Sequence, residues 1–108
     1  MSVLDNLLKM LDKGQDNVLL RFGLGNEYLK AGDFAAAQQH LRAALAHDPA
    51  YSAAWKSLGK ALAAAGKHQA AIEAFDQGIA VAEDKGDIQA AKEMRVFRKR
   101  SHKAIAGS

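Results

Sequence analysis

The chain has 108 residues, no cysteine and one proline, and its formal net charge is +3. That length suits one small domain, and the lack of cysteine excludes a disulfide scaffold, a thiol nucleophile and thiolate metal sites. Hydrophobic residues make up 49% of the chain, too many for a disordered protein. Because it holds 23 alanines but only one Trp, two Tyr and four Phe, we predict an all-α fold.

The charge is unevenly placed. Residues 86–108 hold six Lys or Arg and two Asp or Glu, a net of +4, whereas residues 1–85 sum to −1. No run of about 18 apolar residues is present, so we predict no membrane span. Residues 1–13 carry Asp5, Lys9 and Asp12 within an apolar pattern, unlike a signal peptide. We therefore predict a cytoplasmic protein.

The first predicted element is a helix over residues 2–13. Ser2 and Asp5 have the spacing of a capping box, in which each side chain bonds the other residue's backbone N–H. A helical start at Ser2 is therefore expected.

A helical hairpin is predicted next, because apolar residues recur at helical spacing over 17–31 and again over 34–47. Gly32 can end the first of these helices in a left-handed conformation, and Asp33 can cap the second. The pair Asp48–Pro49 ends the hairpin, since proline disfavours helical geometry in the preceding residue.

A second hairpin follows over 50–65 and 68–81, with Gly66 at its turn. Lys67 stands where the first hairpin has its capping Asp, so we expect the second turn to be the weaker one. Each hairpin also has a glycine inside its first helix, Gly25 or Gly59, at a cost of about 1 kcal/mol against alanine. We expect each to face a small partner such as Ala37 or Ala71, and the sequence offers no packing reason for Gly23.

The last predicted helix occupies residues 86–104, with Asp87 as its cap. A packing stripe runs along it through Ala90, Ala91, Met94 and Phe97. We expect residues 105–108 to form a disordered tail.

The two hairpins repeat with a period of 34 residues. A shift of 34 aligns Leu24–Gly25 with Leu58–Gly59 and Gly32 with Gly66. It also superimposes the small residues Ala37 and Ala71 and the bulky positions between these pairs. One offset shared by so many positions indicates an internal repeat.

These residues resemble the tetratricopeptide repeat (TPR), whose signature is Trp-x2-Leu-Gly-x2-Tyr, then Ala-x3-Phe, then Pro. The positions that carry the resemblance are Leu24, Gly25, Tyr28, Ala37, Leu41 and Pro49, then Trp55, Leu58, Gly59, Leu62, Ala71 and Phe75. Arg21 departs most from the pattern, because it stands where the first repeat should have Trp.

The resemblance implies a TPR-like right-handed superhelix of antiparallel helix pairs, with about six helices in one domain over residues 1–104. Its parts would be an N-terminal cap helix (2–13), two repeats (18–51 and 52–85) and a C-terminal cap helix (86–104). Two repeats alone would be marginal, since about three are usually needed, and the cap helices supply the third.

The resemblance also implies a concave groove that receives a peptide. Carried onto this sequence, it would be lined by Phe22, Asn26, Leu29, Lys30, Lys56, Lys60, Met94, Phe97 and Arg98. An acidic peptide with apolar residues would complement this set. One TPR subfamily clamps chaperone C-termini with Lys and Asn. Only Asn26 matches that clamp, and Phe22, Lys60 and Asp87 do not, which argues against chaperone-tail binding.

The last helix carries five cations without an acid among them, namely Arg95, Arg98, Lys99, Arg100 and Lys103. Contact with nucleic acid or an anionic membrane is one interpretation. The favoured one is that cations near a helix C-terminus interact with the helix dipole and keep an exposed helix hydrated.

No catalytic, cofactor or metal motif is evident. The four histidines are read as solvent-exposed, and His40 and His47 lie two turns apart, too far for one metal without further ligands. Trp55 is expected to pack within its own hairpin, although it could anchor a ligand. The sequence therefore predicts a non-catalytic, monomeric protein-interaction module without cofactor. The alternatives are a nucleic-acid accessory domain using the basic helix and a self-associating structural subunit.

Overall fold

The computed structural model describes residues 2–107, which form six α-helices and no strand, as the all-α prediction required. The helices are α1 (Val3–Asp12), α2 (Val18–Lys30), α3 (Phe34–His47), α4 (Ser52–Ala64), α5 (His68–Asp84) and α6 (Ile88–Ala106). Each predicted helix is therefore present, and the ends differ from the predicted ones by up to three residues.

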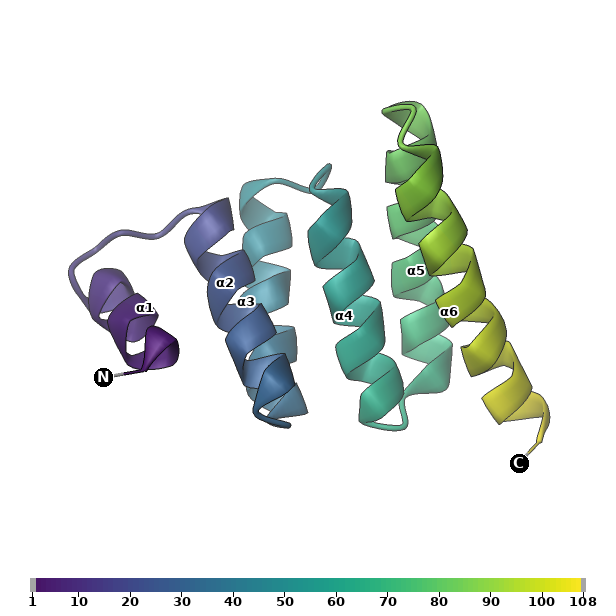
Figure 1. Cartoon of the computed structure of the whole chain (residues 1–108), viewed down its shortest axis with the longest axis horizontal. Coiled ribbons are helices and arrows are strands. Elements are labelled where there is room, and N and C mark those ends of the chain that lie inside the picture. The colour runs from purple at the N-terminus through teal and green to yellow at the C-terminus, as the bar shows by residue number, and fades with distance from the viewer. Residues whose placement is uncertain (1, 108) are drawn as a thin grey trace.

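Successive helices run antiparallel and stack along a 44 Å axis, with the two ends of the chain at opposite ends of that axis (Figure 1). The helices α2, α4 and α6 run parallel to one another in one layer, and α3 and α5 lie behind them (Figure 1). Each hairpin packs closely on itself, α2 with α3 and α4 with α5, and α1 and α6 cover the two ends of the stack. Among the described residues, no helix combines the length and the apolar character needed to cross a membrane.

The two hairpin turns share one geometry and differ in their caps. Gly32 and Gly66 both have φ of +80°, in the left-handed region that costs a residue with a Cβ extra energy. Asp33 then caps α3 by accepting the Ala36 N–H at 3.1 Å. Lys67 precedes α5 without any side-chain cap, as the sequence predicted.

The outer helices have the predicted N-caps, but the last helix ends later than expected. The Asp5 N–H donates to Ser2 Oγ at 3.1 Å and the Ser2 N–H donates to Asp5 Oδ2 at 3.4 Å, which is the capping box. Asp87 caps α6 in the same way as Asp33 caps α3. The expected disordered tail is instead helical up to Ala106, because the alanine-rich segment contains no helix breaker before Gly107. Ser108 lies outside the described residues.

The core forms one continuous cluster along the stack, and its largest members are Phe75, Leu24, Leu41, Leu58 and Leu62. The interior glycines face these large side chains, which corrects the expectation of small partners. A Cβ on Gly25 would lie 2.5 Å from Leu41 Cδ2, and one on Gly59 would lie 2.4 Å from Phe75 Cε1. Glycine therefore lets one bulky residue per repeat reach the neighbouring helix backbone.

Two further glycines show how the cap helices pack. A Cβ on Gly23 would lie 3.4 Å from Leu7 Cδ1, an ordinary contact, so α1 approaches α2 closely at this point. A Cβ on Gly78 would lie 2.4 Å from Met94 Sδ and 2.7 Å from Trp55 Cβ. Gly78 thus brings α5 into close contact with both α4 and α6.

Candidate functional site

Two hollows lie between the parallel helices α4 and α6. A hollow of about 240 Å³ lies at the N-terminal ends of both helices and a pocket of about 320 Å³ lies toward their C-terminal ends. We call the hollow at the N-terminal ends the upper hollow and the pocket toward the C-terminal ends the lower pocket. The upper hollow is lined by Ser52, Ala53, Lys56, Asp87, Gln89, Ala90, Glu93 and Met94. We call the two hollows together the α4–α6 groove.

An ion pair spans the upper hollow from α4 to α6. Lys56 Nζ on α4 donates to Glu93 Oε1 on α6 at 3.1 Å, and both side chains are partly exposed. A surface pair of this kind contributes at most about 1 kcal/mol. The pair can therefore open for a ligand at low cost.

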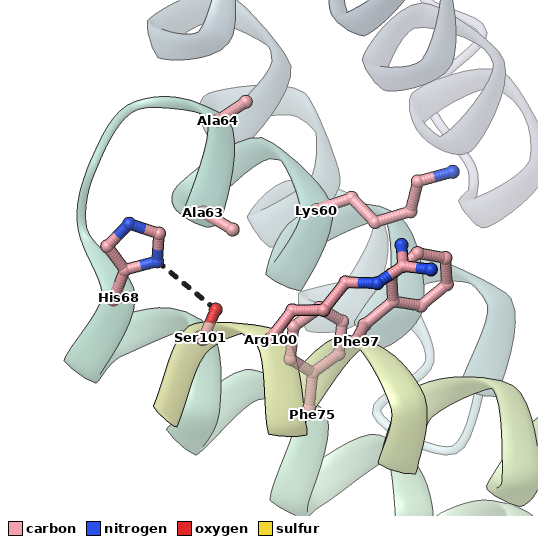
Figure 2. A pocket seen from close by; sticks show the side chains of 8 residues that line it. All are labelled: Lys60, Ala63, Ala64, His68, Phe75, Phe97, Arg100 and Ser101. Atoms are coloured by element: carbon pink, nitrogen blue, oxygen red, sulfur yellow. Dashed lines mark hydrogen bonds between the residues drawn. The ribbon is translucent and has the colours of Figure 1, made fainter. Parts of the chain in front are cut away.

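The lower pocket has an apolar floor and a cationic rim (Figure 2). The rings of Phe75 on α5 and Phe97 on α6 are stacked with their centroids 5.9 Å apart. Lys60 Nζ and the Arg100 guanidinium carbon each lie 5.3 Å from the Phe97 centroid, close enough for cation–π attraction. Its remaining lining residues are Ala63, Ala64, His68 and Ser101.

The predicted groove residues of α2 are engaged with neighbouring residues. Phe22 packs on Tyr51 with a centroid distance of 5.1 Å, and Asn26 Oδ1 accepts the Ser57 hydroxyl at 2.8 Å. Lys30 pairs with Glu27 at 3.5 Å, and Leu29 packs half-buried against the core. Asn26 therefore joins α2 to α4, and its carbonyl oxygen is already occupied.

Two predicted groove residues on α6 are held by contacts with α5. Met94 is fully buried (0% exposed), because it fills the space above Gly78, so it contributes only floor to the upper hollow. Arg98 Nη1 donates to Asp76 Oδ1 of α5 at 2.7 Å, which directs this side chain toward α5 rather than α4.

The groove residues that the sequence prediction missed include Glu93, Arg100 and Ser101. Arg100 had been assigned only to the basic helix. A signal was present, since Glu93, Phe97 and Arg100 follow one another at spacings of four and three and so share a helix face.

The basic face of α6 is partly neutralised by α5. Arg95 pairs with Glu83 at 2.7 Å, as Arg98 does with Asp76. Lys99 and Lys103 are exposed. Two of the five cations thus fix α6 to α5, which weakens the case for a nucleic-acid surface.

A second polar cluster joins the α1–α2 loop to the first hairpin. Asp16 accepts Arg21 Nε at 2.8 Å, Arg21 Nη2 at 2.9 Å and His47 Nε2 at 2.9 Å. Arg21 Nη1 also donates to His40 Nδ1 at 3.0 Å, and the His40 ring stacks on Tyr28 with centroids 5.4 Å apart. The departure from the repeat signature at Arg21 therefore has a structural use.

Charged members of this cluster shift the pKa values of their neighbours. Hydrogen bonds from Arg21 and then His47 hold the pKa of the Asp16 carboxyl well below its usual range, and Asp16 raises the pKa of Arg21. Burial, and then the nearby Arg21 charge, lowers the pKa of His40. Because arginine can only donate, His40 Nδ1 is an acceptor and the ring is neutral.

This cluster corrects the reading of all four histidines as exposed. His40 is only 8% exposed, because it lies between Tyr28 and Arg21. His68 is half-buried beside Ser101. Within residues 2–107 no three His, Asp or Glu side chains are grouped so that they could hold a metal ion.

Most of the signature residues of the two repeats are buried. Tyr28 and Trp55 are half-buried and Pro49 is exposed. The Trp55 indole N–H donates to the Pro49 carbonyl oxygen at 2.8 Å, which links the start of α4 to the preceding turn. The fully buried members are Leu24, Gly25, Ala37, Leu41, Leu58, Gly59, Leu62, Ala71 and Phe75.

Comparison with known proteins agrees with this architecture. Residues 22–88 match the family model described as tetratricopeptide repeat. The chain is 52% identical over 102 residues to a TPR repeat-containing protein of Pseudomonas aeruginosa, covering 94% of this chain and 97% of that protein. The chain therefore belongs to the tetratricopeptide repeat family.

Two solved structures share the fold. The solution structure of a Bordetella parapertussis protein is 46% identical, with a TM-score of 0.84 over 95% of this chain and 90% of that one. The crystal structure of a tetratricopeptide repeat domain protein from Salinibacter ruber is 25% identical, with a TM-score of 0.72 over 79% of this chain and 96% of that one. The recognised family and the all-α TPR-like fold are thus both confirmed.

Proposed function

We propose that this chain is a non-catalytic protein-interaction module that binds an extended, acidic and partly apolar peptide in the α4–α6 groove. The observation that carries the proposal is the groove itself, which comprises two hollows along parallel helices. Lys56, Lys60 and Arg100 line it, and the acids Asp87 and Glu93 line its upper hollow. TPR domains generally bind protein partners, and the apolar floor and cationic rim of the lower pocket complement such a peptide.

The test begins with a random-peptide library displayed so that some members have free C-termini and others are internal. Peptides selected on the whole chain are then titrated into ¹⁵N-labelled protein. We expect the shifted amide signals to belong to residues that line the groove, for example Ala53, Ala63, Ala90 and Phe97.

Charge reversal supplies the control for this experiment. Lys56→Glu with Lys60→Glu should abolish binding and leave the far-ultraviolet circular dichroism unchanged. The matched pair Lys92→Glu with Lys99→Glu makes the same change in net charge on exposed positions of α6 that line neither hollow, and should bind normally. Equal loss in both pairs, or signals shifted outside the groove, would reject the groove as the binding site.

The proposal includes a monomer acting in the cytoplasm. Sedimentation velocity across micromolar to millimolar concentration should then give the mass of one chain. A concentration-dependent dimer would favour the self-associating alternative.

A further inference from the structure

The last helix of the stack has one side that no other helix covers. In the layer formed by α2, α4 and α6, α2 packs on both α1 and α3, and α4 packs on both α3 and α5. Within residues 2–107, α6 packs on α5 and α4 alone, so its far side forms the end of the stack (Figure 1). Met94 lies against Gly78 of α5, and Ser101 is hydrogen-bonded to His68 of α5. The side of α6 opposite these two residues is therefore open.

Five exposed residues form a stripe along this open side, which we call the outer stripe. They are Ile88, Lys92, Val96, Lys99 and Lys103. Their spacings of four, four, three and four place them on one face of the helix. Met94 is two positions from Lys92 and from Val96, so it points to the opposite side. The outer stripe thus faces away from α5, and none of its members lines either hollow of the α4–α6 groove.

The charge of the outer stripe has one sign. Its three lysines form no ion pair with any acid in residues 2–107, whereas Arg95 and Arg98 are paired with acids of α5. Lys99 and Lys103 are four residues apart, a spacing at which like charges on a helix repel. Acidic groups of a partner would relieve this repulsion and complement the stripe.

Apolar side chains lie among these lysines. Ile88 is 68% exposed and Val96 is 51% exposed, which is unusual for large aliphatic side chains on a packed helix. The stripe spans about 23 Å, and side chains three and four apart form a ridge that fits the groove of a second helix. Lysine stems can lie on the apolar side chains of such a helix while their ammonium groups reach acids at its edges.

Other anionic partners match the stripe less well. Helices that lie on a membrane present a broad apolar face with Trp, Phe or Leu, whereas here lysines alternate with only Ile88 and Val96. Single-stranded nucleic acid stacks on aromatic side chains, and the stripe has none. The combination of cations and two aliphatic side chains along one ridge favours an acidic protein helix.

We propose that the outer stripe of α6 is a second interaction surface, which docks an amphipathic helix of a partner protein with acidic residues beside its apolar face. This inference goes beyond the proposed function, because the stripe and the α4–α6 groove lie on different faces of α6 and bind different shapes of ligand.

The test uses a designed peptide of about 16 residues, which spans about 24 Å as a helix. Leucines at alternating spacings of three and four form its apolar face, glutamates flank them, and a side-chain lactam holds the helix. Titrated into the ¹⁵N-labelled whole chain, it should shift the amide signals of Ile88, Lys92, Val96, Lys99 and Lys103. A peptide of the same composition with its leucines spread around the helix should bind about tenfold more weakly or worse. Equal binding of the two peptides, or no binding of the first, would overturn the proposal.

Two matched charge reversals separate the outer stripe from the groove. Lys92→Glu with Lys99→Glu should weaken binding of the designed helix by about tenfold or more. Lys56→Glu with Lys60→Glu makes the same change in net charge within the groove and should leave this affinity unchanged. Equal losses in both pairs would mean general charge attraction and reject the stripe. Because extended peptides in the groove should respond in the opposite way, failure of one surface leaves the other testable.

Substitution of the apolar part completes the test. Val96→Ser should weaken binding of the designed helix, whereas Leu19→Ser, at another exposed apolar position, should not. Unchanged circular dichroism establishes that each variant is folded.

The remaining partners are separate outcomes. Vesicles of phosphatidylserine with phosphatidylcholine, or a random-sequence DNA, that bound the stripe more tightly than the designed helix would overturn the assignment to a protein helix. Stripe signals that shift with protein concentration alone would show that a second copy of the chain covers it, which would also overturn the proposal.

Discussion

The two repeats hold the same backbone arrangement by different chemistry. The cluster of the first repeat uses Asp16, Arg21, His40 and His47, and the residues 34 positions later are Ala50, Trp55, Ala74 and Val81. A charged and hydrogen-bonded set in one hairpin is thus replaced, position for position, by an apolar set in the next.

This difference shows which part of the repeat is fixed by packing. The leucines, the small residues and the turn glycines recur in both hairpins, because the helices must approach equally closely. The outer positions are free to be polar or apolar, provided that every buried polar atom has a partner. That condition is met, since within residues 2–107 no buried side-chain nitrogen or oxygen lacks a hydrogen bond.

The largest expected effect on the free energy of unfolding comes from a substitution that makes the two repeats more alike at one position. Gly78 corresponds to Ala44 of the first repeat, and alanine is the better helix former by about 1 kcal/mol. Gly78→Ala should nevertheless lower the free energy of unfolding by about 1–3 kcal/mol, because the new Cβ would meet Trp55 Cβ and Met94 Sδ. Urea denaturation followed by circular dichroism measures the change.

Gly23→Ala is the matched control for that substitution. Its Cβ would meet only the tip of Leu7 at 3.4 Å, so the gain in helix propensity should leave stability equal or slightly higher. A stabilised Gly78→Ala protein would show that α6 can move away from α5 at little cost.

A cap transferred from the first repeat should have a smaller effect. Lys67→Asp gives α5 the residue that caps α3 and should raise the free energy of unfolding by about 0.5–1 kcal/mol. The reverse change, Asp33→Ala, should cost about 1 kcal/mol. Thermal denaturation of both variants measures the two effects, and no gain from Lys67→Asp would mean that the turn there cannot adopt the capping geometry.

The smallest expected effect is an acid sensitivity confined to the first repeat. The pKa of His40 is lowered in the folded state, so below about pH 6.5 the unfolded chain binds more protons and stability falls. The pKa of Asp16 is also lowered in the folded state, so Asp16 adds a further loss of stability only when the pH falls below 3.8, the ordinary pKa of this carboxyl. The difference between the urea midpoints measured at pH 7.5 and pH 5 therefore reports mainly on the titration of His40.

His40→Gln tests this assignment. The glutamine carbonyl can accept the hydrogen bond from Arg21 but does not titrate, so the difference between the two urea midpoints should shrink. An unchanged difference would place the acid sensitivity elsewhere in the chain.

Much of the fold could be read from the sequence, because the repeat encodes it twice. Gly32 and Gly66 mark the turns, and the 34-residue period fixes which helices pair. The partners of Gly25 and Gly59 were not readable, because the sequence does not give the depth at which Leu41 and Phe75 enter the neighbouring helix. The same is true of His40, whose burial depends on a residue 19 positions away.

The groove was less predictable than the fold. The family pattern predicts which side chains of α2 and α4 face the groove. The sequence of α6 departs from that pattern, and the contacts of α6 with α5 decide which of its side chains face the groove. Met94 is buried over Gly78, and Arg98 turns to Asp76. Lys60 of α4 and Arg100 of α6 both approach the ring of Phe97 at the lower pocket. Such contacts depend on three helices at once and have no signature in one stretch of sequence.

The matching turns at Gly32 and Gly66 have a consequence for the length of the protein. Their φ angles are equal, and each is followed by a helix that packs in the same way on its predecessor. A duplicated segment of residues 32–65 would therefore meet existing junction geometry at both of its ends. Such a duplication would insert one more concave helix and carry α6, with the end of the groove, one repeat further along the stack.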